Sequence, residues 1–151
     1  MEIVKKVVVL MAAFSFSLFA NNIIIKESHC SFEKTVENIR HIVKGKGLHV
    51  FAVINHSGNA KAVGMKLNQS KMIIFGNAKL GTALMQQDMT VGLDLPLRIL
   101  VFRDSDAKVK MAYRDGSWLA GKHILHAKKK IAKINNAMDK ITTKAGQCKK
   151  D

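Results

Sequence analysis

The sequence is poor in several residue types that mark common protein classes. Its 151 residues include one proline, one tryptophan, one tyrosine and two cysteines, and 11 acidic residues stand against 25 lysines and arginines. Hydrophobic residues make up 48% and charged residues 24% of the chain. This composition argues against disorder and predicts one compact domain with a core.

The shortage of acidic residues leaves a formal net charge of +14. In a cytosolic protein such a charge would suggest a nucleic-acid partner. The sequence nevertheless has no arginine-rich cluster, no aromatic residues interleaved with basic ones and no recognisable nucleic-acid motif. We therefore expect no nucleic-acid partner. Much of the excess charge lies in the lysine-rich residues 122–151, a pattern typical of a solvated helix face.

The apolar run at the N-terminus is short. Two lysines precede it, it extends from Val7 to Ala20, and polar residues follow. This arrangement is typical of a secretory signal, whereas a membrane span needs about 20 residues. We expect cleavage after residue 20, so that residues 1–20 are a signal peptide and residues 21–151 form a single periplasmic or secreted domain that is not an integral membrane protein. An uncleaved anchor is the alternative.

The cysteines, Cys30 and Cys148, lie near opposite ends of the expected mature chain. An oxidising compartment permits a disulfide between them. Because no CxxC spacing is present, we do not expect a redox-active pair. A structural bridge and two unrelated thiols both stay open.

Hydrophobic periodicity predicts the order of helices and strands. Strands are expected at residues 22–28, 48–55, 71–76, 95–104 and 108–115, with the last two joined in a hairpin through residues 105–107. Helices are expected after the N-cap Ser31, over residues 56–64 and 77–88, and over a long C-terminal segment, 124–151.

This order predicts a single α+β domain with a largely antiparallel sheet, helices packed on one face and a long C-terminal helix. The apolar stripe of that helix favours core packing over a coiled coil. A homodimer stays open as an alternative.

The stretch "FGNAKLGTA" resembles a phosphate-binding loop, because four residues separate Gly76 from Gly81 between a strand and a helix. Such a loop needs lysine and then serine or threonine after the second glycine. Here Thr82 and Ala83 occupy those places, so the nucleotide interpretation fails. Asn77 is better explained as a helix N-cap, and we expect Gly81 to allow close packing of that helix on the sheet.

Two segments, "FGNAKLGTALMQ" and "GLDLPLR", together with "MAYRDGSWLAGKHIL", resemble the domain of unknown function 302 family over about residues 28–125. The resemblance implies a TATA-binding-protein-like α+β fold and no assigned activity. Ala78 stands where the family usually has proline, which weakens a helix cap. His126 and the lysine-rich tail lie outside the family pattern.

Polar residues that match the family occur at expected strand ends and helix starts, where binding sites concentrate. As ligand-binding candidates we take His56, Asn59, Asn77, Lys79, Asp94, Arg98 and His123. Each also has a structural interpretation: His56, Asn59 and Asn77 as helix caps, Lys79 as a solvated residue, and Asp94 with Arg98 as a pair that orients the loop around Pro96.

Nucleophilic catalysis has little support in the sequence. Ser57 and His56 are adjacent and do not face each other, no G-x-S-x-G turn is present, and carboxylates are scarce. We expect no catalytic residues. The sequence favours an exported binding or accessory module for a small ligand, a metal or haem. The alternative is a structural or interaction protein that docks an acidic partner through its basic C-terminal helix.

A metal site is one form of the binding hypothesis. His123 and His126 are three residues apart at the expected start of the last helix, where they would share a face. Imidazoles suit zinc, copper or nickel, and His56 across a loop would complete the site. The alternatives are histidines near solvent, with an apolar or anionic ligand held near Asn77 and Arg98.

Overall fold

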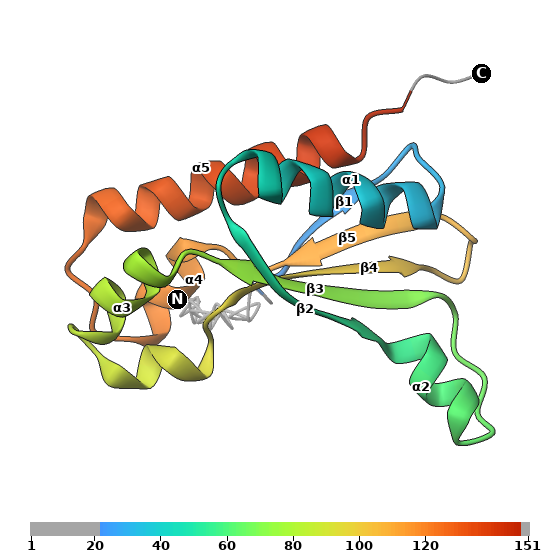
Figure 1. Ribbon diagram of the computed structural model, residues 1–151, viewed down its shortest axis with the longest axis horizontal. Coiled ribbons are helices and arrows are strands. Elements are labelled where there is room, and N and C mark those ends of the chain that lie inside the picture. The colour runs from blue at the N-terminus through green and yellow to red at the C-terminus, as the bar shows by residue number, and fades with distance from the viewer. Residues whose placement is uncertain (1–21, 149–151) are drawn as a thin grey trace, which may run out of the picture.

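Five strands form one antiparallel sheet in the computed structural model, which describes residues 22–148 (Figure 1). The strand order is β1-β5-β4-β3-β2, and every neighbouring pair is antiparallel. The first strand therefore lies at one edge, beside the last. The strands are β1 (Ile24–Glu27), β2 (His49–Asn55), β3 (Ser70–Gly76), β4 (Leu97–Arg103) and β5 (Val109–Tyr113).

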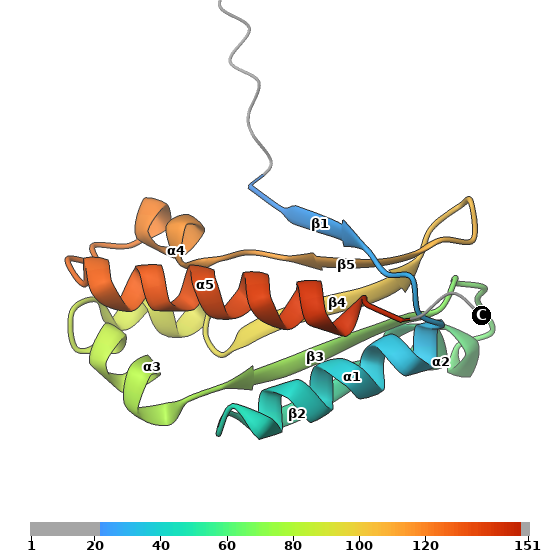
Figure 2. The same cartoon turned by 90° about the horizontal axis from the view of Figure 1, so that it is seen from above.

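Two long helices, α1 (Phe32–Gly45) and α5 (Lys128–Ala145), lie side by side along one face of the sheet and run in opposite directions (Figure 2). The short helix α2 (His56–Ala62) extends from one end of the sheet. Three others lie at the opposite end: α3 (Ala78–Met85), the 3-10 helix η1 (Met89–Leu93) and α4 (Gly116–Lys122) (Figure 1). The predicted α+β class, antiparallel sheet and long C-terminal helix are confirmed.

The core lies between the sheet and the two long helices. Its fully buried side chains come from alternate positions of the strands and from one stripe of each helix, as the periods of two and 3.6 residues require. They include Ile73, Phe75, Ile99, Val101 and Met111 from the strands, and Ile39, Val43, Met138 and Ile141 from the helices.

Local signals predicted from the sequence are present at several element ends. The Ser31 hydroxyl accepts a hydrogen bond from the Lys34 amide at the start of α1. The hairpin between β4 and β5 turns where it was expected, and Asp104 accepts hydrogen bonds from the amides of Asp106 and Lys108. Carboxylates that satisfy turn amides are a common device in such loops.

The start of the C-terminal helix was predicted wrongly. The helix begins at Lys128, because the backbone before it is fixed by tertiary partners. The Ile124 amide donates to the Asp88 carboxylate at 3.0 Å, and the His126 amide donates to the Gln87 side chain at 2.9 Å. These bonds hold the segment against the residues between α3 and η1. The predicted extension of the helix to residue 151 was also wrong, because α5 ends at Ala145 with Gly146 as its C-cap. Residues 149–151 and the expected signal peptide, residues 1–20, lie outside the described residues.

Helices α4 and η1 were not predicted. Helix α4 is short, but Asp115 caps it by accepting a hydrogen bond from the Trp118 amide. Its first residue, Gly116, approaches α5 so closely that an added Cβ would lie 2.8 Å from the Ile131 carbonyl oxygen. Only glycine fits this contact, which fixes α4 on α5.

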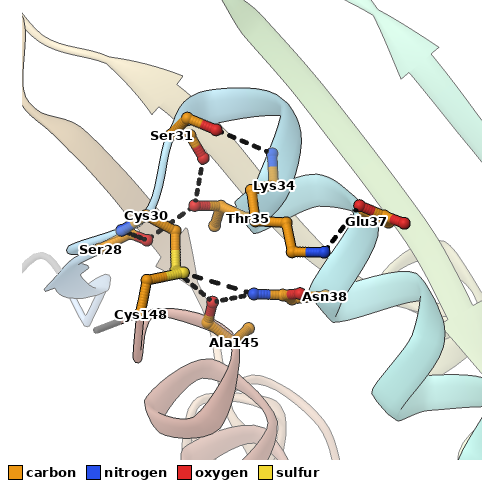
Figure 3. Close-up of a disulfide and its surroundings, with 9 residues drawn as sticks. All are labelled: Ser28, Cys30, Ser31, Lys34, Thr35, Glu37, Asn38, Ala145 and Cys148. Atoms are coloured by element: carbon orange, nitrogen blue, oxygen red, sulfur yellow. Dashed lines mark hydrogen bonds and ion pairs between the residues drawn. A yellow bond between two sulfur atoms is a disulfide. The ribbon is translucent and has the colours of Figure 1, made fainter. Parts of the chain in front are cut away.

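A disulfide joins Cys30, just before α1, to Cys148, just after α5 (Figure 3). The two Cα atoms are 5.1 Å apart, and the residues are separated by 118 positions in the sequence. Of the two alternatives left open by the sequence, the structure has the bridge.

Buried hydrogen bonds surround this bridge (Figure 3). The Ser28 and Thr35 hydroxyls are 2.7 Å apart, and Thr35 donates to the Ser31 carbonyl at 2.8 Å. The Asn38 amide group donates to the Ala145 carbonyl at 3.1 Å, linking α1 directly to the last turn of α5. We call this region, residues 28–38 with residues 145–148, the disulfide corner.

Candidate functional site

The seven predicted ligand-binding residues do not form one site. His56 and Asn59 lie in α2, whereas the other five lie toward the opposite end of the sheet (Figure 1). Asn55, rather than His56 or Asn59, caps α2 by accepting a hydrogen bond from the Gly58 amide at 2.9 Å. His56 and Asn59 therefore share no site with the rest.

The proposed metal site of His56, His123 and His126 is not assembled. His56 lies at the far end of the sheet, and His123 and His126 precede α5 instead of sharing its face. Among residues 22–148, no group of three histidine, cysteine, aspartate or glutamate side chains is placed to hold a metal ion. The sequence spacing was misleading because tertiary contacts, described above, delay the helix start.

His123 instead fastens two loops together. Its side chain is only 8% exposed; Nε2 lies 2.7 Å from an Asp94 oxygen and Nδ1 lies 3.0 Å from the Thr90 hydroxyl. Thr90 also donates to Asp88 at 2.6 Å. This hydrogen bond, followed by the one from the Ile124 amide, lowers the pKa of Asp88 from its ordinary value of 3.8. The contacts join η1 to the segment after α4.

Arg98 has a related structural role. Its guanidinium donates to the Leu93 carbonyl at 2.9 Å, which fixes the last turn of η1. Asp94 contacts His123, not Arg98. The two residues thus orient the loop before β4, as one interpretation of the sequence had it, but through separate partners.

A cavity of about 340 Å³ lies between α3, η1 and the start of β4. We call it the apolar pocket. Asn77 shapes its wall by capping α3, accepting a hydrogen bond from the Leu80 amide at 3.0 Å. The cis peptide Leu95–Pro96 forms the facing wall. Most of the lining is aliphatic or aromatic and includes Phe51, Leu80, Leu84, Met85, Leu95 and Leu97.

Gly81 contributes empty volume to this pocket. A Cβ at this position would lie 3.8 Å from its nearest neighbour, Leu95 Cδ1, which is an ordinary contact. The expected close packing of α3 on the sheet at Gly81 is therefore not what the structure has. The absence of a side chain leaves room in the pocket.

A second cavity, of about 560 Å³, adjoins the apolar pocket and shares part of its wall. The shared residues are Gly76, Asn77, Leu80, Leu97 and Ile134. Four lysines line this cavity, which we call the lysine groove: Lys46, Lys79, Lys130 and Lys133.

No acidic side chain of residues 22–148 lines the lysine groove or the apolar pocket. Within residues 22–148, the ion pairs of lysine involve Lys26, Lys34, Lys71, Lys108 and Lys110, none of which lies in the groove. Only Lys79 was a candidate from the sequence. The signal for two others was the three-residue spacing of Lys130 and Lys133, which places them on one helix face.

The segments that carry the family resemblance, residues 75–86 and 92–98, supply most of the lining of the apolar pocket. Sequence similarity extends to curated proteins. The chain is 37% identical over 116 residues to the "Fluoride-specific ion channel FluC 1" of Brucella suis biovar 1 (strain 1330), covering 77% of this chain and 46% of that protein.

A second relative is the "Fluoride-specific ion channel FluC 2" of Brucella melitensis biotype 1, also 37% identical over 116 residues, with 43% of that protein covered. The chain thus spans less than half the length of these relatives, whose name describes the whole proteins. Along residues 22–148, no helix combines the length and apolar composition that crossing a membrane requires.

The fold is similar to a solved structure, the "uncharacterized conserved protein DUF302 from Bacillus stearothermophilus". The TM-score is 0.75 at 16% sequence identity, and the match covers 83% of this chain and 99% of that chain. The family model described as "Domain of unknown function DUF302" matches residues 24–141. The chain belongs to this family.

Proposed function

We propose that this protein is an exported binding module that holds a small, largely apolar ligand in the apolar pocket. One observation carries the proposal: the two segments typical of the family converge on a pocket whose lining is mainly aliphatic and aromatic. Small-molecule sites are concave, mostly apolar and about 300–1,000 Å³ in volume, and this pocket of about 340 Å³ lies within that range.

Export is the second part of the proposal. The disulfide between Cys30 and Cys148 supports it, because such bonds persist in oxidising compartments. The basic and then apolar start of the sequence supports it independently. The TATA-binding-protein-like description of the fold remains a prediction of the resemblance and contributes nothing to this assignment.

The pocket is tested by filling it. Calorimetry with 1-octanol as the probe should detect binding to the wild type, and Gly81→Leu should weaken it at least tenfold, because the new side chain occupies the pocket. Gly121→Leu is the matched control, since a Cβ at Gly121 has no neighbour within 4 Å. The proposal is overturned if the wild type binds no 1-octanol, or if Gly81→Leu and Gly121→Leu bind it equally.

The alternative, a protein that docks an acidic partner through α5, is favoured by the exposed lysines Lys128 and Lys129 at the start of that helix. If this alternative is correct, the wild type should bind a polyglutamate peptide in a salt-dependent manner and should not bind 1-octanol. Charge reversal at Lys128 and Lys129 should then abolish peptide binding.

A further inference from the structure

We infer that the lysine groove is the head-group subsite of the apolar pocket, so that the ligand is an amphipathic anion, an alkyl chain that ends in a carboxylate or phosphate. The inference rests on the proposed function, because the alkyl chain lies in the apolar pocket. It adds a positively charged subsite, which would select apolar molecules that carry an anionic head group over those that do not.

The geometry joins the two cavities into one site. Leu80 and Leu97 line both, and so do Gly76, Asn77 and Ile134. A molecule whose tail lies against Leu80 in the apolar pocket therefore reaches the groove without leaving the protein surface. An amphipathic ligand needs an apolar wall and a polar wall that adjoin, and these two cavities provide both.

The charge of the groove is built from three separate helices. Lys46 follows the end of α1, Lys79 lies in the first turn of α3, and Lys130 and Lys133 lie on α5. The groove is lined by these four lysines and by no carboxylate of residues 22–148, so its lining carries a net positive charge. A net positive charge favours a bound anion over a neutral or cationic molecule.

Five lysines outside the groove form ion pairs within residues 22–148, whereas none of the four groove lysines does. Lys71 contacts Glu33 at 2.9 Å and Lys110 contacts Asp104 at 2.6 Å, whereas no carboxylate between residues 22 and 148 lines the groove. The first turn of α3, at the shared wall, adds the positive end of a helix dipole. The four lysines are therefore available to a ligand.

The experiment compares four probes with one tail: octanoate, octyl phosphate, 1-octanol and octylammonium, titrated calorimetrically into the full chain. We expect octanoate or octyl phosphate to bind at least tenfold more tightly than 1-octanol, and octylammonium to bind more weakly than 1-octanol. The stronger of the two anions identifies the head group as a carboxylate or a phosphate.

The variant Lys79→Gln/Lys130→Gln/Lys133→Gln should lose the preference for the anion and keep its affinity for 1-octanol. The matched control, Lys122→Gln/Lys128→Gln/Lys129→Gln, removes the same charge from exposed residues that do not line the groove and should keep the preference.

Equal binding of octanoate, octyl phosphate and 1-octanol by the wild type would overturn the inference and leave the proposed function standing. Loss of the preference in both triple variants would also overturn it, because net charge and not the groove would then be responsible. No binding of any probe would overturn the proposed function itself. Anion binding that survives Gly81→Leu would show that the tail does not lie in the apolar pocket.

Discussion

The two ends of the paired helices α1 and α5 differ in how their polar groups are satisfied. At the disulfide corner, hydroxyls, amides and carbonyls bond one another, and a covalent bridge closes the end. At the opposite end, four lysines line a groove beside the apolar pocket, and no carboxylate from the described part of the chain lines it. Polar or charged groups that lack partners within the fold are expected at functional sites. The first end is cross-linked, and the second is the end at which we propose that a ligand binds.

The disulfide should have the largest effect on stability. We expect Cys30→Ala/Cys148→Ala to lower the free energy of unfolding by about 4–5 kcal/mol, because a bridge across so long a loop restricts the unfolded chain. Urea unfolding measures this loss. At a temperature where the variant is folded, binding of 1-octanol should be unchanged.

If Cys30→Ala/Cys148→Ala lowered the affinity for 1-octanol as well as the stability, the disulfide corner and the apolar pocket would not be independent of each other. Alkylation of both wild-type cysteines without prior reduction would show that the bridge is not formed in the purified protein.

Replacement of His123 should have an intermediate effect on stability, confined to the end of the domain that holds η1 and the apolar pocket. Its replacement by alanine removes contacts to Asp94 and Thr90, and hydrogen bonds to charged groups contribute about 1.5–3 kcal/mol. We expect His123→Ala to lower the free energy of unfolding by roughly that amount and to speed amide exchange in η1.

His126→Ala is the matched control, because the backbone and not the side chain of His126 contacts Gln87. Unfolding of the whole domain by His123→Ala, with exchange equally fast at the disulfide corner, would contradict a local role.

Asp88 should have the smallest effect on stability, recognised by its dependence on pH. Its pKa is lowered in the folded protein, so its contribution to stability is complete above the ordinary value of 3.8 and is lost as the pH falls below it. Asp88→Asn should therefore flatten the decline in stability below that pH. The decline should not vanish, because the hydrogen bond from Lys110 also lowers the pKa of Asp104. Identical acid profiles of wild type and variant would exclude this contribution.

The fold could be predicted from the sequence wherever local signals agree with tertiary contacts. Ser31 and Asn77 cap helices as expected, and the strands follow their apolar runs. The prediction failed around Ile124, whose apolar spacing suggested a helix. Its amide instead bonds Asp88, a residue 36 positions away, which no local pattern reveals.

The candidate site was predictable only in part. Asn77 and Lys79 lie in the segment that resembles the family, and both line the lysine groove. Lys46 was indistinguishable from a solvated lysine, because its place beside the groove depends on how the end of α1 meets α5. The three-residue spacing of His123 and His126 suggested a metal site. Such a spacing places two side chains on one face only within a helix, and both residues precede α5.

The position of β1 sets the order in which the domain can be completed. This strand precedes the other four in the sequence but pairs with β5, whose residues follow more than 80 positions later: Ile24 faces Tyr113 and Glu27 faces Lys110. Pairings so distant in sequence are slow to form, because the entropy of closing the long intervening loop must be overcome first. The pairings among β2, β3 and β4 join strands that are nearer in sequence, whereas the pairing of β1 requires β5. The edge of the sheet, and with it the start of α1, is therefore closed only when nearly the whole domain has been made.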